Sequence, residues 1–311
     1  MDNLTHSLIG AALAQTGLKR KTGLAMPALI LAANLPDIDA PCAIYGVESL
    51  TMRRGITHGP IALLVLPLVL AGLLILFDRW QARRGKRPEG RLPVHPGWLI
   101  ALCYLGTLSH PLFDWFNNYG IRLLEPFSSR WFYGDTLFII DVWILAMLGF
   151  GLWRSLKRER SGAANPFRPA RAAVAGVAAY VLLNMAISDV HRTLAMGDVP
   201  YPVVGVSNAL PVTFWRRDVL IRTGDGRIGT IPCSLLHCDR SNLELRPDGL
   251  NQPGLDRMTA GNPEARAFLF WSRMPFVERE GNDLVLRDQR FAQSPARDNF
   301  MVRLGPASTA K

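Results

Sequence analysis

Cysteine and histidine are scarce in this chain of 311 residues, which contains four cysteines and six histidines. The cysteines form no CxxC pattern, which argues against a zinc knuckle or a dithiol redox motif. Cys233 and Cys238 lie close together and would be able to pair if the C-terminal part is exported, although two free thiols are an equally open alternative.

The sequence shows no signal for a cleaved leader, and its basic charge has an explanation other than nucleic-acid binding. The opening residues, MDNLTHSL, lack the basic segment of a cleavable signal peptide, so we expect membrane insertion to use internal segments. The net charge of +10 is compatible with nucleic-acid binding. Its basic residues, however, cluster in short loops between apolar runs, which is the pattern that sets membrane orientation. We therefore expect membrane lipids as partners and no nucleic acid.

Long apolar runs are confined to about the first 190 residues. Two of them, at 4–18 and 23–35, are too short to span a bilayer and are predicted to form a helical hairpin packed within the protein. Pro36 is predicted to end the second of these helices. The longer runs are predicted transmembrane helices, at residues 59–77, about 96–116, about 136–153 and about 171–188.

The C-terminal part alternates apolar and polar residues around Gly-Asp and Gly-Asn turns, which predicts strands and hairpins. The expected fold is therefore a mainly α membrane protein. It consists of a bundle of about four transmembrane helices, a short N-terminal helical hairpin and a smaller β-rich soluble domain. We expect the helical membrane domain to cover residues 1–190 and the β-rich domain residues 191–311.

The basic loops at 79–91 and 154–171 are predicted to face the cytoplasm. This orientation predicts a multi-pass protein of the bacterial inner (plasma) membrane with an extracytoplasmic C-terminal domain. It also brings the histidines and aspartates at the ends of the spans to one outer face, namely His6, Asp37, Asp39, His58, His110, Asp114 and Asp135.

The segment LSHPLFDWFNN places His110 and Asp114 four residues apart, which puts them one turn apart on one face of a helix. Placing an ionisable pair at membrane depth costs free energy, so its presence there favours a functional role. Imidazole and carboxylate ligands together suit zinc, manganese or iron. For the other members of the set, a helix cap at His58 and a solvated turn at Asp37 and Asp39 are the ordinary alternatives.

Five pieces of the chain, DNLTHSLIGAAL, LAANLPDID, RGITHGP, LSHPLFDWFNNYG and YGDTLFIIDVW, resemble the YdjM-like family of inner-membrane metal-dependent hydrolases over about residues 1–150. A more remote similarity is to zinc-dependent phospholipase C and P1-type nucleases, which order their ligands in the same way. The resemblance implies one or two divalent ions, zinc first, and Asp114 would be able to bridge two of them. The implied ligands are His6, Asp37, His58, His110 and Asp114.

The function implied by this resemblance is hydrolysis of a phosphoester or lipid-like substrate by metal-activated water. Asp39 is the expected general base. Arg122 and Arg130 would bind an anionic head group, with solvated loop charges as the alternative.

No histidine follows His110 until His191, so we expect Asp135 and Asp141 to be additional metal ligands or to hydrogen-bond the ligands from outside the metal site. We expect Asp141 to lie about 9 Å deeper along a helix than Asp135. There it would orient a ligand histidine or hydrogen-bond a neighbouring helix. The competing function is a non-enzymatic membrane protein with a structural metal site or a transport role.

Overall fold

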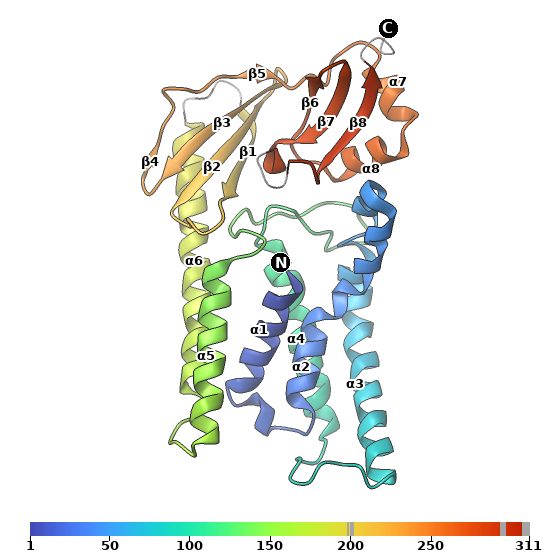
Figure 1. Ribbon diagram of the computed structural model, residues 1–311, viewed down its shortest axis with the longest axis vertical. Coiled ribbons are helices and arrows are strands. Elements are labelled where there is room, and N and C mark those ends of the chain that lie inside the picture. The colour runs from blue at the N-terminus through green and yellow to red at the C-terminus, as the bar shows by residue number, and fades with distance from the viewer. Residues whose placement is uncertain (198, 200–201, 293–296, 307–311) are drawn as a thin grey trace. The chain divides into compact units, whose positions relative to one another are not determined.

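The computed structural model describes residues 1–197, 199, 202–292 and 297–306. The chain is mainly helical up to Met196 and rich in β-strands afterwards, as the sequence predicts (Figure 1). It divides into two compact units. The first comprises residues 1–39 and 54–183, and the second comprises residues 40–53 and 184–311.

Helices form the first unit, and the last of them continues into the second. They are α1 (Asn3–Gln15), α2 (Ala25–Asn34), α3 (Pro60–Arg83), α4 (Pro96–Trp115), α5 (Val142–Arg160) and α6 (Arg168–Met196). Tighter 3-10 turns occur at Leu18–Arg20, Leu35–Thr51 and Ile56–His58. The α-helical hydrogen-bond pattern of α2 ends at Asn34, just before Pro36, as predicted. Leu35 keeps α-helical angles (φ −63°, ψ −38°), but Pro36 has no N–H group to continue the pattern.

Small residues allow α1, α2 and α4 to pack backbone against backbone. A Cβ atom on Gly10 of α1 would lie 2.5 Å from the carbonyl oxygen of Leu29 in α2. One on Gly106 of α4 would lie 2.7 Å from the Cβ atom of Ala32, also in α2. Close helix crossings at glycine and alanine are typical of membrane bundles. The predicted α1–α2 hairpin is thus packed within the unit and holds α4 against it.

Two of the described helices, α3 and α6, are long and apolar enough to cross a membrane, with mean hydropathies of 2.8 and 1.7. On α3, Leu64, Leu73 and Leu76 are 61%, 59% and 59% exposed, as expected for a face that contacts lipid. The predicted α4 and α5 are present as helices, but neither passes the same test among the described residues. Four spans therefore stay a prediction.

Two antiparallel sheets form most of the second unit (Figure 1). The first has the order β1-β2-β3-β4, with β5 paired to β3, and the second has the order β6-β7-β8. The strands of the first sheet are β1 (Pro202–Ala209), β2 (Arg216–Thr223), β3 (Arg227–Ser234), β4 (His237–Cys238) and β5 (Arg246–Pro247). Those of the second are β6 (Pro275–Glu280), β7 (Asp283–Asp288) and β8 (Met301–Pro306), and two short helices, α7 (Leu255–Ala260) and α8 (Pro263–Trp271), precede them.

The two C-terminal cysteines pair. Cys233 of β3 and Cys238 of β4 are opposite each other in the sheet and form a disulfide. Their strands belong to an apolar core in which Val219, Ile221 and Ile231 are fully buried. The disulfide therefore closes the hairpin at the edge of that core, and the alternative of two free thiols does not apply.

Candidate metal centre

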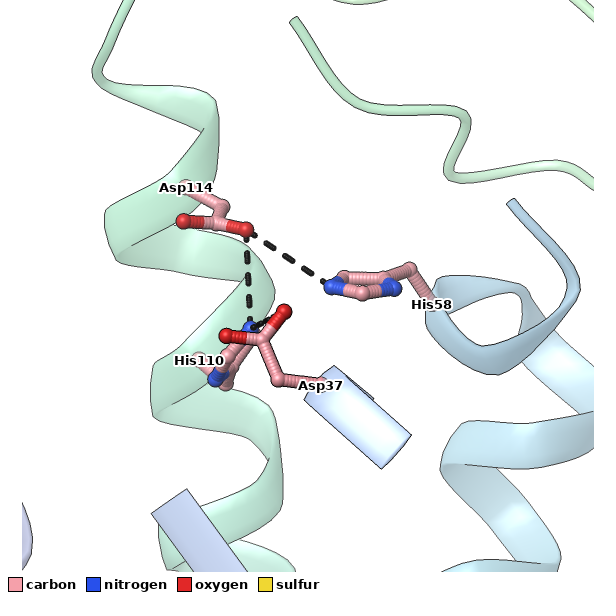
Figure 2. Close-up of side chains that lie close together, drawn as sticks. All are labelled: Asp37, His58, His110 and Asp114. Atoms are coloured by element: carbon pink, nitrogen blue, oxygen red, sulfur yellow. Dashed lines mark ion pairs between the residues drawn. The ribbon is translucent and has the colours of Figure 1, made fainter. Parts of the chain in front are cut away.

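Side chains from three separate segments meet in the first unit (Figure 2). Asp37 comes from the 3-10 turns after α2, His58 from the turn before α3, and His110 and Asp114 from α4. Each offers one ligand atom, and these atoms all lie within 4.8 Å of one another. We call these four residues the His/Asp cluster. All four are buried.

Asp114 is the central carboxylate of the cluster. Its Oδ2 atom lies 3.5 Å from Nε2 of His110 and 3.6 Å from Nε2 of His58. Nε2 of His110 is also 3.7 Å from Oδ1 of Asp37 (Figure 2). The predicted i, i+4 spacing on α4 thus places an imidazole and a carboxylate side by side, and the two other segments complete the group.

The backbone of α2 sets the orientation of His110. Nδ1 of this ring lies 2.7 Å from the carbonyl oxygen of Ala33. Because a carbonyl only accepts, Nδ1 carries the proton and donates it, which leaves a lone pair on Nε2. That Nε2 atom is buried and makes no hydrogen bond to any described residue. A histidine held by a backbone carbonyl through one nitrogen is the usual arrangement of a metal ligand.

His6 and Asp39 border the cluster without belonging to it. The ring of His6 stacks on that of His110 at 3.8 Å, and its Nε2 atom lies 3.3 Å from Oδ1 of Asp114. Oδ2 of Asp39 accepts hydrogen bonds from the Arg54 amide and the Thr57 hydroxyl, both at 2.8 Å. The same oxygen is 3.7 Å from Nδ1 of His58, on the side of the ring away from Asp114.

Arg54 is a site residue that the sequence reasoning missed. Its Nε atom lies 3.1 Å from Oδ2 of Asp114, and its Nη2 atom donates to Oδ1 of Asp114 at 3.1 Å. Nη1 donates to Oδ1 of Asn117 at 3.2 Å. The amino group of Met1 also contacts Oδ1 of Asp114. The sequence offered one signal for Arg54, namely its position in RRGITHGP, four residues before the predicted ligand His58. An arginine in that position is typical of any basic loop, so the pattern did not indicate a site residue.

The family model of the YdjM inner membrane protein matches residues 1–190, which include every residue of the His/Asp cluster. This chain belongs to that family. Neither the curated proteins nor the solved structures gave a match. The remote similarity to zinc-dependent phospholipase C and P1-type nucleases therefore stays a prediction.

The two arginines that we expect to bind an anionic group have different surroundings in this YdjM-family protein. Arg122 is buried, and its Nη1 atom forms an ion pair with Glu125 at 3.2 Å. Its guanidinium also faces the ring of Trp131 at 5.2 Å. Arg130 is exposed and lies over the ring of Phe132 at 5.4 Å. Arg122 is thus a fixed group near the site, whereas Arg130 is a surface charge.

Asp141 caps a helix instead of lying inside one. The predicted span beginning at about 136 starts at Val142 because the carboxylate of Asp141 accepts hydrogen bonds from the amides of Trp143 and Ile144 at 3.0 and 3.1 Å. The hydroxyl of Tyr180 in α6 donates to its other oxygen at 3.0 Å. Of the two predicted alternatives, the bond to a neighbouring helix is the one observed. Asp135 is buried with a φ of 51° and is not one of the four clustered residues.

Proposed function

We propose that this protein is a membrane-bound hydrolase whose His/Asp cluster holds a divalent metal. The observation that carries the proposal is the convergence of two imidazoles and two carboxylates in a buried place, where Nε2 of His110 makes no hydrogen bond to any residue that the structure describes. Such a group is costly to bury alone, and a bound cation offsets the cost by taking up the lone pairs.

The donor set suits zinc, and part of its spacing is compatible with a zinc site. Zinc accepts nitrogen and oxygen ligands at about 2.0–2.2 Å in a tetrahedron, so neighbouring ligand atoms lie about 3.3–3.6 Å apart. Three separations within the cluster are 3.5, 3.6 and 3.7 Å, and all four ligand atoms lie within 4.8 Å of one another. Manganese and iron accept the same ligand types, whereas magnesium prefers oxygen ligands alone. One ion is accommodated by the four clustered residues, and a second would require His6 or Asp39.

A bound metal would supply a water of lowered pKa for attack on a phosphoester. The surrounding side chains have separable tasks in this proposal. Arg54 holds the carboxylate of Asp114 through two of its nitrogens. Asp39 accepts from the Arg54 amide and faces Nδ1 of His58, which suits a positioning role for that imidazole. Its use as the general base, and head-group binding by Arg122 and Arg130, stay predictions.

A lipid-like substrate is favoured by where the family resides. The chain belongs to a family of inner membrane proteins, and α3 and α6 have the length and hydropathy of membrane spans. The Cys233–Cys238 disulfide favours an extracytoplasmic second unit, because disulfides persist in oxidising compartments and are rare in the cytosol. The predicted orientation of the helices places the His/Asp cluster at the same outer face of the membrane, so we assign the substrate to that face.

A structural ion is the second candidate, and it too has an observation in its favour. The side chains of His58, His110 and Asp114 are all 0% exposed. Structural zinc sites are closed and four-coordinate, whereas catalytic sites keep one position open to water. The two candidates differ in a measurable way, because only the catalytic site would exchange a water molecule and turn over substrate.

The test is a hydrolysis screen on full-length protein in detergent or nanodiscs, stripped of metal and reloaded with zinc or manganese. Phospholipids, lipid-linked phosphates and a generic phosphoester serve as substrates. We expect metal-dependent turnover that is lost in His110→Ala and kept in His237→Ala, an exposed histidine of the second unit. Tight metal binding without turnover of any of these substrates would support the structural ion and refute the hydrolase.

A further inference from the structure

One end of the first sheet in the second unit is unusually apolar. The β1–β2 connection (residues 210–215) and the β3–β4 turn (Leu235 and Leu236) lie at the same end, because the strands run antiparallel in order (Figure 1). Val212, Leu235 and Leu236, which we call the apolar tip, are 53%, 65% and 80% exposed. The opposite end of the sheet carries a polar Gly-Asp-Gly turn whose Asp225 is exposed.

Turn chemistry does not account for the side chains of Leu235 and Val212. Two-residue hairpin turns favour Asn-Gly or Asp-Gly, because the turn needs positive φ angles that other residues adopt at a cost. Leu235 has a φ of 52° and Val212 a φ of 69°. Apolar, and in one case β-branched, side chains are therefore kept where a glycine would relieve strain, which points to a role for their exposed surface.

The apolar tip is held in place from two sides. The Cys233–Cys238 disulfide closes the hairpin immediately behind Leu235 and Leu236. The amide of Leu235 donates to the carbonyl of Trp215 at 2.9 Å, which ties the turn to the neighbouring connection. A preorganised tip of this kind loses little conformational entropy when it enters another phase.

Contacts with α6 locate the tip along that helix. Nη2 of Arg217, at the tip end of β2, donates to Oδ1 of Asn184 at 2.8 Å. Nε2 of His191 contacts the carbonyl oxygen of Leu235. The apolar tip therefore lies beside the part of α6 that runs from Asn184 to His191.

The direction of the sheet follows from its core. Ala195, near the C-terminal end of α6, packs with Val219 and Ile221, which come after Arg217 along β2. Moving along β2 away from the tip thus corresponds to moving toward the C-terminus of α6. The tip itself points back along α6, toward residues 184–188, which end a stretch from 172 to 188 without a charged side chain.

We propose that the apolar tip inserts into the boundary between head groups and acyl chains of the bilayer that α6 crosses. Asp189 and Arg192 end the uncharged stretch of α6, so the membrane surface lies near His191, the residue that contacts the tip. The exposed Arg216 beside the tip suits the phosphate groups of lipids. This inference depends on membrane insertion of α6 and is independent of the hydrolase proposal.

Photo-crosslinking tests the proposal on the full-length protein in nanodiscs of phosphatidylethanolamine and phosphatidylglycerol. The photoreactive residue p-benzoylphenylalanine replaces Leu236 in one variant and Asn282, at the exposed polar turn between β6 and β7, in the matched control. A third variant carries it at Leu73, on the exposed face of α3, as a positive control. Adducts are identified by mass spectrometry.

We expect lipid adducts at position 236 in yields within a few-fold of those at 73 and at least tenfold above those at 282. Lipid adducts at 73 without any at 236 would overturn the proposal. So would crosslinks from 236 to protein alone, which would identify the apolar tip as a docking surface for another chain or a second copy. Equal lipid labelling at 236 and 282 would also overturn it, because the labelling would then be nonspecific.

Discussion

Replacing Gly106 with alanine should disturb the proposed metal centre by moving the backbone. Gly106 lies one turn before His110 on α4, where it faces α2. An added Cβ would lie 2.7 Å from the Cβ of Ala32 and 2.9 Å from the carbonyl oxygen of Leu29. Ordinary carbon contacts need about 3.5–4.0 Å, so the two helices must separate by about 1 Å.

That separation acts on the hydrogen bond that orients His110, a proposed metal ligand. The 2.7 Å contact between Nδ1 of His110 and the carbonyl oxygen of Ala33 would lengthen beyond hydrogen-bond range. Overpacking of this kind costs about 1–3 kcal/mol of stability. Loss of a partner that orients a ligand lowers metal affinity about 10–100-fold. We therefore expect Gly106→Ala to unfold at lower temperature and to bind metal more weakly.

The assay combines thermal unfolding in detergent, followed by circular dichroism, with metal competition against a chelator. Gly149→Ala in α5 is the matched control, because an added Cβ there would meet no atom within 4 Å. The control should be as stable as the unmodified protein or slightly more so, since alanine favours helix by about 1 kcal/mol over glycine. Unchanged stability and unchanged metal affinity in Gly106→Ala would refute the reasoning.

Three further outcomes follow from single contacts. Asp39→Asn should weaken metal binding about 10–100-fold in the chelator assay, because this carboxylate borders the cluster as a positioning group; unchanged affinity would exclude that role. Burial raises the pKa of Asp288, but Arg290 at 2.9 Å outweighs burial and holds that pKa below its ordinary value. The stability that the ionised Asp288 contributes should therefore be present above about pH 3.9 and lost as the pH falls through its lower folded-state pKa. In acid titrations of unfolding, Asp288→Asn should abolish this pH dependence. Tyr180→Phe, which removes the hydrogen bond to Asp141, should lower stability by about 1 kcal/mol without changing metal content, and loss of metal would connect Asp141 to the site after all.

Part of the site was predictable because it depends on regular geometry. The i, i+4 spacing of His110 and Asp114 is enough to place them together on α4. The orientation predicted from the basic loops placed Asp37 and His58 at the same end of the bundle as His110 and Asp114, and the structure brings these four residues together. These inferences need only helix periodicity and the direction of each segment, both of which are encoded locally.

The remaining features depend on irregular backbone, which local patterns do not determine. Asp37 joins the cluster and Asp39 borders it, a distinction set by 3-10 turns after α2. Arg54 has a φ of 53°, and from this backbone conformation its side chain reaches Asp114. Its sequence context resembles that of any basic loop. The start of α5 was misplaced because the apolar residues before Asp141 continue the hydrophobic pattern, while only the capping carboxylate marks the first turn.

Metal content is the most direct test of the central claim that the His/Asp cluster is a metal centre. Full-length protein purified without chelators should contain about one equivalent of a divalent metal by elemental analysis, with zinc expected. His110→Ala and Asp114→Asn should lose it, whereas His237→Ala should retain it. Folded wild-type protein that contains no metal, and takes up none on dialysis against zinc or manganese, would contradict the account.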